Sequence, residues 1–196
     1  SGAHYLDGTT DITRTIQLGA VTDLHRRVYT LVLKGHLSLQ NLCFPRGAAG
    51  TQLDAVARVA MWRDGMNFMH GTGHGVGSYL SVHEGPHQIR QEYRPAPMLE
   101  GMTVTDEPGL YLAGKFGVRI ENTLLTVPYL TTEFGRFLRF EPLTLCPIDT
   151  RPIVVDMLSA EELAVLNAYH QMVYERLSPM LDAEHRAWLA AKTRNL

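Results

Sequence analysis

Residues 70–77 constrain this chain more than any other segment, because they read His-Gly-Thr-Gly-His-Gly-Val-Gly. A run in which every second residue is glycine does not form a regular helix or strand. Glycine either lets the backbone approach another group closely or takes a positive φ angle. Four histidines, His70, His74, His83 and His87, lie in or just after this segment. Their density is the first indication of a chemical site.

The N-terminal region is expected to hold a turn and a strand. Residues 5–8 end in Asp-Gly, a pair that favours a tight turn. Residues 11–16 alternate with a period of two, which predicts a strand with Asp11 and Thr13 on the same face. Two later strands, at about 102–107 and 117–127, are expected to lie side by side through a hairpin at 109–114.

Helices are expected on both sides of these later strands. Thr22 is expected to cap a first helix, and a second runs from about residue 51 to 62 with Gly65 as its stop. In the tail, about 151–196, Ser159 begins a capping box, and Pro179 fits the first turn of a last helix. The order of strand, helices, strands and helices predicts an α+β fold in a single domain of 196 residues.

Charge and composition exclude two classes of partner. The formal net charge is −2 and the basic residues are scattered, so we expect no nucleic-acid partner. No apolar run approaches the ~18 residues that span a bilayer, so we expect no membrane partner. The two cysteines, Cys43 and Cys146, lack the close spacing of a zinc motif and are expected to be reduced thiols.

Candidate metal ligands stand near turns and strand ends: Asp11, His74, Glu107 and Glu121. Each has a simpler explanation when taken alone. Asp11 fits a turn cap, His74 a loop histidine and Glu107 an exposed strand end. Glu121 interrupts an apolar strand, where a carboxylate is costly unless it is paired or metal-bound, and an ion pair with Arg119 two residues away is the alternative.

Together these four residues form an oxygen-rich donor set. Three carboxylates and one imidazole suit Mn²⁺ or related divalent ions rather than a thiolate zinc site. Bridging carboxylates hold paired ions about 3.5–4 Å apart. Spacing along the sequence does not show whether the four side chains meet.

Four motifs resemble, in the same order, those of the pita-bread metallopeptidases, which include aminopeptidase P, prolidase and methionine aminopeptidase. They are residues 70–77, Val82-His83-Glu84-Gly85-Pro86, Thr105-Asp106-Glu107-Pro108-Gly109 and Arg119-Ile120-Glu121-Asn122. The opening Asp7-Gly-Thr-Thr-Asp11-Ile-Thr-Arg-Thr15 and the later Phe140-Glu-Pro-Leu-Thr-Leu145 resemble aminopeptidase P of the long eukaryotic, cytosolic type. The resemblance covers nearly the whole chain.

The resemblance implies a role for each site residue. Asp11 and Glu121 would bridge two metal ions, most typically Mn²⁺ with Zn²⁺ or Co²⁺ as alternatives, and His74 and Glu107 would complete one site. His70 and His83 match histidines that surround the substrate. Arg119 and Thr13 would contact the ligand carboxylates, not the metal ions, and would orient those carboxylates.

The resemblance also implies a reaction. Hydroxide held between the metals would attack the bond before proline, and Glu107 would carry the proton to the leaving nitrogen. Substrates would be peptides with proline in the second position, the glycines of residues 70–77 would leave room for them, and the enzyme would be a cytoplasmic homodimer. A prolidase acting on dipeptides and a non-catalytic pita-bread binding module are the alternatives.

One family ligand is missing. The family pattern has five ligands, and its first aspartate lies eleven residues before the second. Since Asp11 matches the second aspartate, the first would fall immediately before Ser1. The chain therefore reads as a partial catalytic domain without the first aspartate and the N-terminal domains of the long enzymes. We expect it to bind at most one metal well and to be nearly inactive alone.

Overall fold

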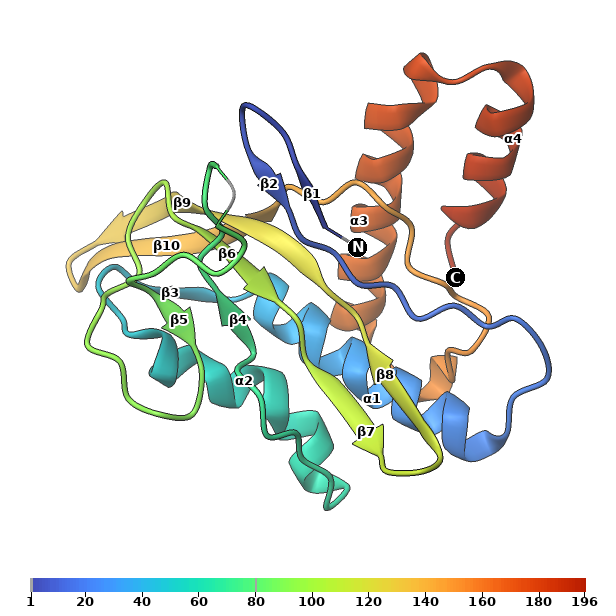
Figure 1. Cartoon of the computed structure of the whole chain (residues 1–196), viewed down its shortest axis with the longest axis horizontal. Coiled ribbons are helices and arrows are strands. Elements are labelled where there is room, and N and C mark those ends of the chain that lie inside the picture. Colours follow the sequence, from blue (N-terminus) through green and yellow to red (C-terminus); the bar gives the residue numbers. More distant parts are fainter. Residues whose placement is uncertain (1, 80) are drawn as a thin grey trace.

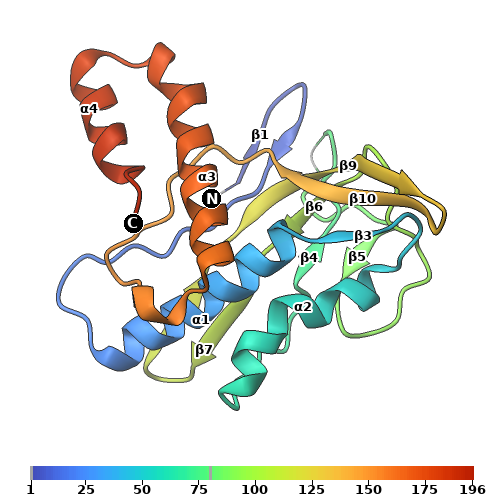
Figure 2. The ribbon, with the colours of Figure 1, turned by 180° about the vertical axis from the view of Figure 1, so that it is seen from behind.

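The computed structural model describes residues 2–79 and 81–196, and its centre is a four-stranded antiparallel sheet (Figure 1). The strand order is β3 (Cys43–Pro45), β10 (Gly135–Pro142), β9 (Asn122–Thr132) and β6 (Thr103–Asp106). Two helices, α1 (Asp23–Gln40) and α2 (Gly50–Arg63), pack against each other beside the sheet, as seen from behind in Figure 2. The mixture of helices and sheet agrees with the predicted α+β class.

Three two-stranded pairs surround the sheet. They are β1 (Ala3–His4) with β2 (Thr9–Thr10), β4 (Gly73–His74) with β5 (Gln88–Ile89), and β7 (Gly109–Leu112) with β8 (Phe116–Arg119). The strand expected over 102–107 pairs with part of the one expected over 117–127, because β6 pairs with β9. The hairpin expected through 109–114 is wrong in detail: residues 109–112 form strand β7, the turn lies between Leu112 and Phe116, and the expected second strand is divided into β8 and β9. The Tyr5 amide donates to the Gly8 carbonyl at 2.9 Å, which closes the predicted tight turn.

The strand predicted over residues 11–16 is wrong, because only Thr13 makes a backbone bridge, to Glu121. The segment is attached by side chains instead. The Thr15 hydroxyl donates to the Arg119 carbonyl at 2.9 Å and accepts from the Arg119 amide at 3.1 Å. The period-two pattern therefore reflects alternating side chains that contact other parts of the chain. It does not reflect a strand paired through backbone hydrogen bonds.

The helices begin close to where the sequence predicts. Thr22 caps α1, α2 covers the predicted span, and Gly65 follows it with a φ of 71°. In the tail, a short 3₁₀ turn (Val155–Met157) precedes α3 (Ala160–Leu177), which Ser159 and Glu162 cap reciprocally.

The predicted start of the last helix is wrong. Pro179 lies in a 3₁₀ turn (Ser178–Met180), whereas α4 (Ala183–Lys192) begins after Asp182, whose carboxylate accepts from the His185 amide. Helices α3 and α4 form a hairpin that projects from the sheet (Figure 1). Within residues 2–79 and 81–196, no helix is both long and apolar enough to cross a membrane.

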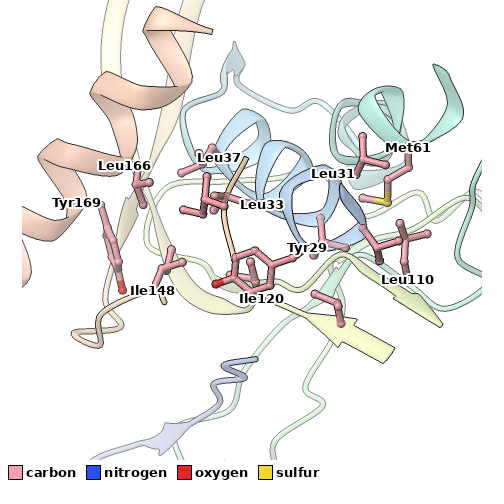
Figure 3. Packing of buried hydrophobic residues seen from close by; sticks show 14 of the residues in the cluster. Tyr29, Leu31, Leu33, Leu37, Met61, Leu110, Ile120, Ile148, Leu166 and Tyr169 are labelled. Atoms are coloured by element: carbon pink, nitrogen blue, oxygen red, sulfur yellow. The ribbon is translucent and has the colours of Figure 1, made fainter. Parts of the chain in front are cut away.

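The main apolar core joins the tail to the first helix and the β7–β8 hairpin (Figure 3). Leu33 of α1, Ile120 after β8 and Leu166 of α3 are all fully buried within it. Burying such a side chain stabilises the fold by about 1.5–3 kcal/mol. The tail is therefore part of the core that supports the strand ends around residues 107 and 121. Both cysteines are free thiols, as expected.

Candidate metal centre

Three of the predicted ligands meet in space. Asp11, His74 and Glu121 each offer a ligand atom, and these atoms lie within 4.8 Å of one another. They come from three separate parts of the chain: the segment after β2, the end of β4, and the break between β8 and β9. Folding, rather than sequence spacing, makes this cluster.

Glu107 completes the set of four around His74. The Nε2 atom of His74 lies 3.2 Å from Glu107 Oε1 and 3.5 Å from Asp11 Oδ2. The register of the sheet explains the position of Glu107, because Asp106 at the end of β6 pairs with Asn122 at the start of β9. Glu107 and Glu121 therefore leave two paired strands at the same edge.

Glycine places His74 against β6. A Cβ atom on Gly73 would collide with the carbonyl oxygen of Thr105, and none of the glycines of residues 70–77 has a positive φ. Close backbone approach is therefore the reason for the glycines. The His74 amide donates to the Thr105 hydroxyl at 3.0 Å, and that hydroxyl donates to Glu107 Oε1 at 3.1 Å.

The prediction that these glycines leave room for substrate is wrong for most of the segment. The space beside Gly73, Gly75 and Gly77 is filled by atoms of this chain, including the carbonyl of Thr105 and atoms of Glu84. These glycines bring strands and loops together, and of the four in residues 70–77 only Gly71 and Gly73 also border the cavity described below.

Burial, together with the neighbouring carboxylates, disfavours the ionised form of the Glu121 side chain. Burial raises the pKa of Glu121 to about 7, and the charges of Glu107 and Asp11 act in the same direction, while the Thr13 hydroxyl and Arg119 oppose them. Removing carboxylates from water without a cation is costly. A divalent ion among Asp11, His74 and Glu121 would relieve that cost, so the donor set fits a metal.

Arg119 and Thr13, the two residues expected to orient the ligand carboxylates, each contact one of those carboxylates. Arg119 Nη1 lies 3.4 Å from Glu107 Oε2, and its Nε donates to the Tyr111 hydroxyl at 2.8 Å. Arg119 therefore forms its ion pair with Glu107. The alternative from the sequence had been an ion pair between Arg119 and Glu121. The Thr13 hydroxyl donates to Glu121 Oε2 at 2.5 Å.

His83 and His70 line the hollow next to the ligands. The rings of His83 and His74 lie 4.1 Å apart between centroids. A cavity of about 330 Å³ is lined by His70, Gly71, Gly73, His74, His83, Gln88, Arg90, Glu107 and Arg119. Both histidines can therefore reach a molecule that contacts Glu107.

His70 is held with one nitrogen available. Its Nδ1 donates to the Gly71 carbonyl at 2.7 Å, while its buried Nε2 has no partner in the part of the chain that the structure describes. Burial lowers the pKa of His70. A neutral ring with this tautomer would leave Nε2 as an unpaired acceptor.

The sequence interpretation missed a buried polar network behind the ligands. His36 Nδ1 lies 3.1 Å from Asp106 Oδ2, and both side chains are fully buried. The Asn122 amide donates to Gln40 Oε1 at 2.8 Å. Asp106 and Asn122 are each adjacent in sequence to a candidate ligand, and this adjacency was the sequence feature that could have indicated the network. His87, counted in the histidine cluster, is buried against the Thr103 carbonyl and does not line the cavity.

Residues 1–128 match metallopeptidase family M24, and residues 136–196 match the C-terminal region of the same peptidases. The chain belongs to metallopeptidase family M24. Its M24 relatives include aminopeptidase P1 of Lotus japonicus, 46% identical over 98% of this chain and 30% of that protein. A probable Xaa-Pro aminopeptidase P of Aspergillus niger is also 46% identical, over 98% of this chain and 33% of that protein.

Solved M24 structures confirm the predicted pita-bread fold. X-prolyl aminopeptidase of Caenorhabditis elegans, described as a cytosolic enzyme with a di-nuclear active site, matches with a TM-score of 0.93 and 41% identity. That match covers 100% of this chain and 32% of the worm enzyme. Prolidase of Pyrococcus furiosus matches with a TM-score of 0.60 and 34% identity, over 71% of this chain and 38% of that one. The chain thus spans about a third of the length of such relatives.

Proposed function

We propose that the protein carrying this chain is a metal-dependent aminopeptidase that hydrolyses the bond between an N-terminal residue and a following proline. The observation that carries the proposal is the convergence of Asp11, His74, Glu107 and Glu121 beside a cavity that His70 and His83 line. The Lotus and Aspergillus relatives carry the names of enzymes with this activity.

The cofactor in this proposal is a pair of divalent ions, most typically Mn²⁺, with Zn²⁺ or Co²⁺ as alternatives. The di-nuclear site described for the worm enzyme supports the number, and the oxygen-rich donor set supports hard ions. When bound, the ions would supply Lewis-acid activation of a water molecule and of the scissile carbonyl.

The residues of this chain have distinct proposed tasks. Glu107 would accept the proton of the attacking water and deliver it to the leaving proline nitrogen, since Arg119 and His74 fix its two oxygens. His83 would donate a hydrogen bond to the oxygen on which negative charge develops. His70 would position the proline residue, while Arg119 and Thr13 would orient the ligand carboxylates.

The 196 residues alone are proposed to be a partial catalytic domain. The relatives are about three times as long as this chain, and the family resemblance implies a set of five ligands, of which four correspond to residues of this chain. With four of five ligands, the chain would bind at most one metal ion with high affinity and would hydrolyse little substrate. A cytoplasmic location is proposed because the worm enzyme is described as cytosolic, and a homodimer because the family resemblance implies one.

The alternatives differ in a measurable way. A prolidase would cleave X-Pro dipeptides, whereas an aminopeptidase P would also cleave longer X-Pro peptides. The larger identity and coverage of the aminopeptidase relatives favour the second. A non-catalytic binding module would release no amino acid from either substrate. Assaying the complete protein with a dipeptide and a longer X-Pro peptide in Mn²⁺ separates the three.

A further inference from the structure

The Arg14 guanidinium contacts the backbone of Glu121 and of Thr13, next to the candidate metal centre. Its Nη1 donates to the carbonyls of Thr13, at 3.0 Å, and Glu121, at 2.6 Å. Its Nη2 donates to Asn122 Oδ1 at 2.8 Å. One guanidinium therefore holds the backbone of the ligand Glu121 together with the residue whose hydroxyl contacts that ligand's carboxylate.

The same guanidinium is anchored on the other side by the tail. Its Nε donates to the Pro147 carbonyl at 3.0 Å, and its Nη2 donates to the Cys146 carbonyl at 2.7 Å and to the Tyr169 hydroxyl at 2.8 Å. Tyr169 lies on α3 and packs in the main core near Ile148 (Figure 3). Arg14 thus connects the backbone of Glu121 to residues 146–147 and to α3.

We propose that Arg14 is a positioning residue for the metal centre, which fixes the backbone at Thr13 and Glu121 and so sets where the Glu121 carboxylate points. The inference deepens the proposed function and depends on it, because it takes Glu121 as a ligand. A planar guanidinium presents its donors in a rigid fork, whereas a lysine ammonium offers a point charge on a flexible stem. Lysine cannot reach both sets of carbonyls at once.

Mn²⁺ titration of the complete protein that carries this chain tests the inference by calorimetry, and the melting temperature of the metal-free protein is recorded beside it. Groups that orient metal ligands typically change metal affinity about 10–100-fold when removed. Arg14→Lys is therefore expected to weaken Mn²⁺ binding at least about tenfold. Tyr169→Phe, which removes one anchor of the guanidinium, is expected to give a smaller weakening in the same direction.

Arg26→Lys is the matched control. Arg26 also ties the tail to the core, since its Nη2 donates to the Ile153 carbonyl at 3.0 Å. Among residues 2–79 and 81–196, its side-chain hydrogen bonds go to Arg151 and Ile153, neither of which is a proposed ligand. A merely structural role would lower the melting temperature of Arg14→Lys and Arg26→Lys alike and leave both with the Mn²⁺ affinity of the unaltered protein. That result would overturn the inference.

Two further variants keep the outcomes distinct. If Arg14→Lys does not fold, unchanged Mn²⁺ affinity in Tyr169→Phe overturns the positioning role. Glu121→Gln tests the ligand itself and is expected to lose binding. Undiminished binding in Glu121→Gln, or no Mn²⁺ binding by the unaltered complete protein, would contradict the proposed metal centre and the inference with it. Undiminished binding in Arg14→Lys alone contradicts only the inference.

Discussion

The hydroxyl of Thr13 donates to the carboxylate of Glu121 at 2.5 Å, although 108 residues separate them in the sequence. The backbones of the two residues also meet, because the Glu121 amide donates to the Thr13 carbonyl at 3.0 Å. This double attachment brings the N-terminal segment, with Asp11, to the edge of the sheet. The candidate metal centre therefore depends on a contact that no local sequence pattern encodes.

Thr13→Val should weaken Mn²⁺ binding by about tenfold, because a hydrogen bond to a charged group contributes about 1.5–3 kcal/mol. Valine keeps the shape of threonine but cannot donate to the Glu121 carboxylate. Calorimetric titration of the chain gives the affinity. Thr13→Ser retains the hydroxyl and should bind Mn²⁺ like the unaltered chain; equal affinities for the valine and serine variants would rule out this role.

Gly73→Ala should destabilise the fold by about 1–3 kcal/mol or more, because its Cβ would overlap the Thr105 carbonyl and displace His74. Urea unfolding measures the loss. Gly71→Ala is the matched control, since the atoms nearest its Cβ lie at 3.5 and 3.6 Å, which is ordinary contact. If both variants unfold at the same urea concentration, close approach at Gly73 is not what the glycine provides.

The stability of the chain should fall in mild acid because of His170. Burial, with help from the Arg14 guanidinium, lowers the pKa of His170 to about 4, and its Nε2 accepts from the Ile148 amide. An unfolded histidine takes up its proton near pH 6.5, so this contribution is complete above about pH 6.5 and is lost as pH falls toward 4. The loss should be on the order of 3 kcal/mol.

Urea unfolding between pH 7.5 and pH 4.5 checks this dependence. His170→Gln removes the titrating group while keeping an acceptor near Ile148, so its stability should fall less steeply over the same range. Parallel curves for the two proteins would show that other groups cause the acid loss.

Leu166→Ala should cost about 2–5 kcal/mol, because the side chain is fully buried between α3 and the rest of the main core. Chemical unfolding measures the difference. Leu143→Ala, at a position that is 48% exposed, should cost far less. A small effect at Leu166 would mean that the tail adds little to the core behind the site.

The elements that follow local rules could be predicted from the sequence. The α1 and α3 caps at Thr22 and Ser159 satisfy backbone donors within three residues, so their signal is local. Pro179 misled the prediction because proline suits a 3₁₀ turn as well as a helix start, and Asp182 a few residues later provides the better cap. Residues 11–16 misled it because side-chain contacts give the same alternation as a strand.

The candidate ligands could be chosen by residue type and by resemblance, but their meeting could not be derived from spacing. Asp11 reaches His74 only through the Thr13–Glu121 bridge and the approach of Gly73 to β6. The contacts of Arg14 and the His36–Asp106 pair were missed for the same reason, since each joins residues far apart in the sequence. Interactions of this kind are set by topology rather than by periodicity.

The most direct measurement of the central claim compares the complete protein that carries this chain with its Glu121→Ala variant. Each is assayed in Mn²⁺ for release of the first residue from a longer X-Pro peptide, and the metal content of each is determined. The unaltered protein should release that residue, and Glu121→Ala should lose both metal and activity. Full activity in Glu121→Ala would contradict a metal centre built on this carboxylate.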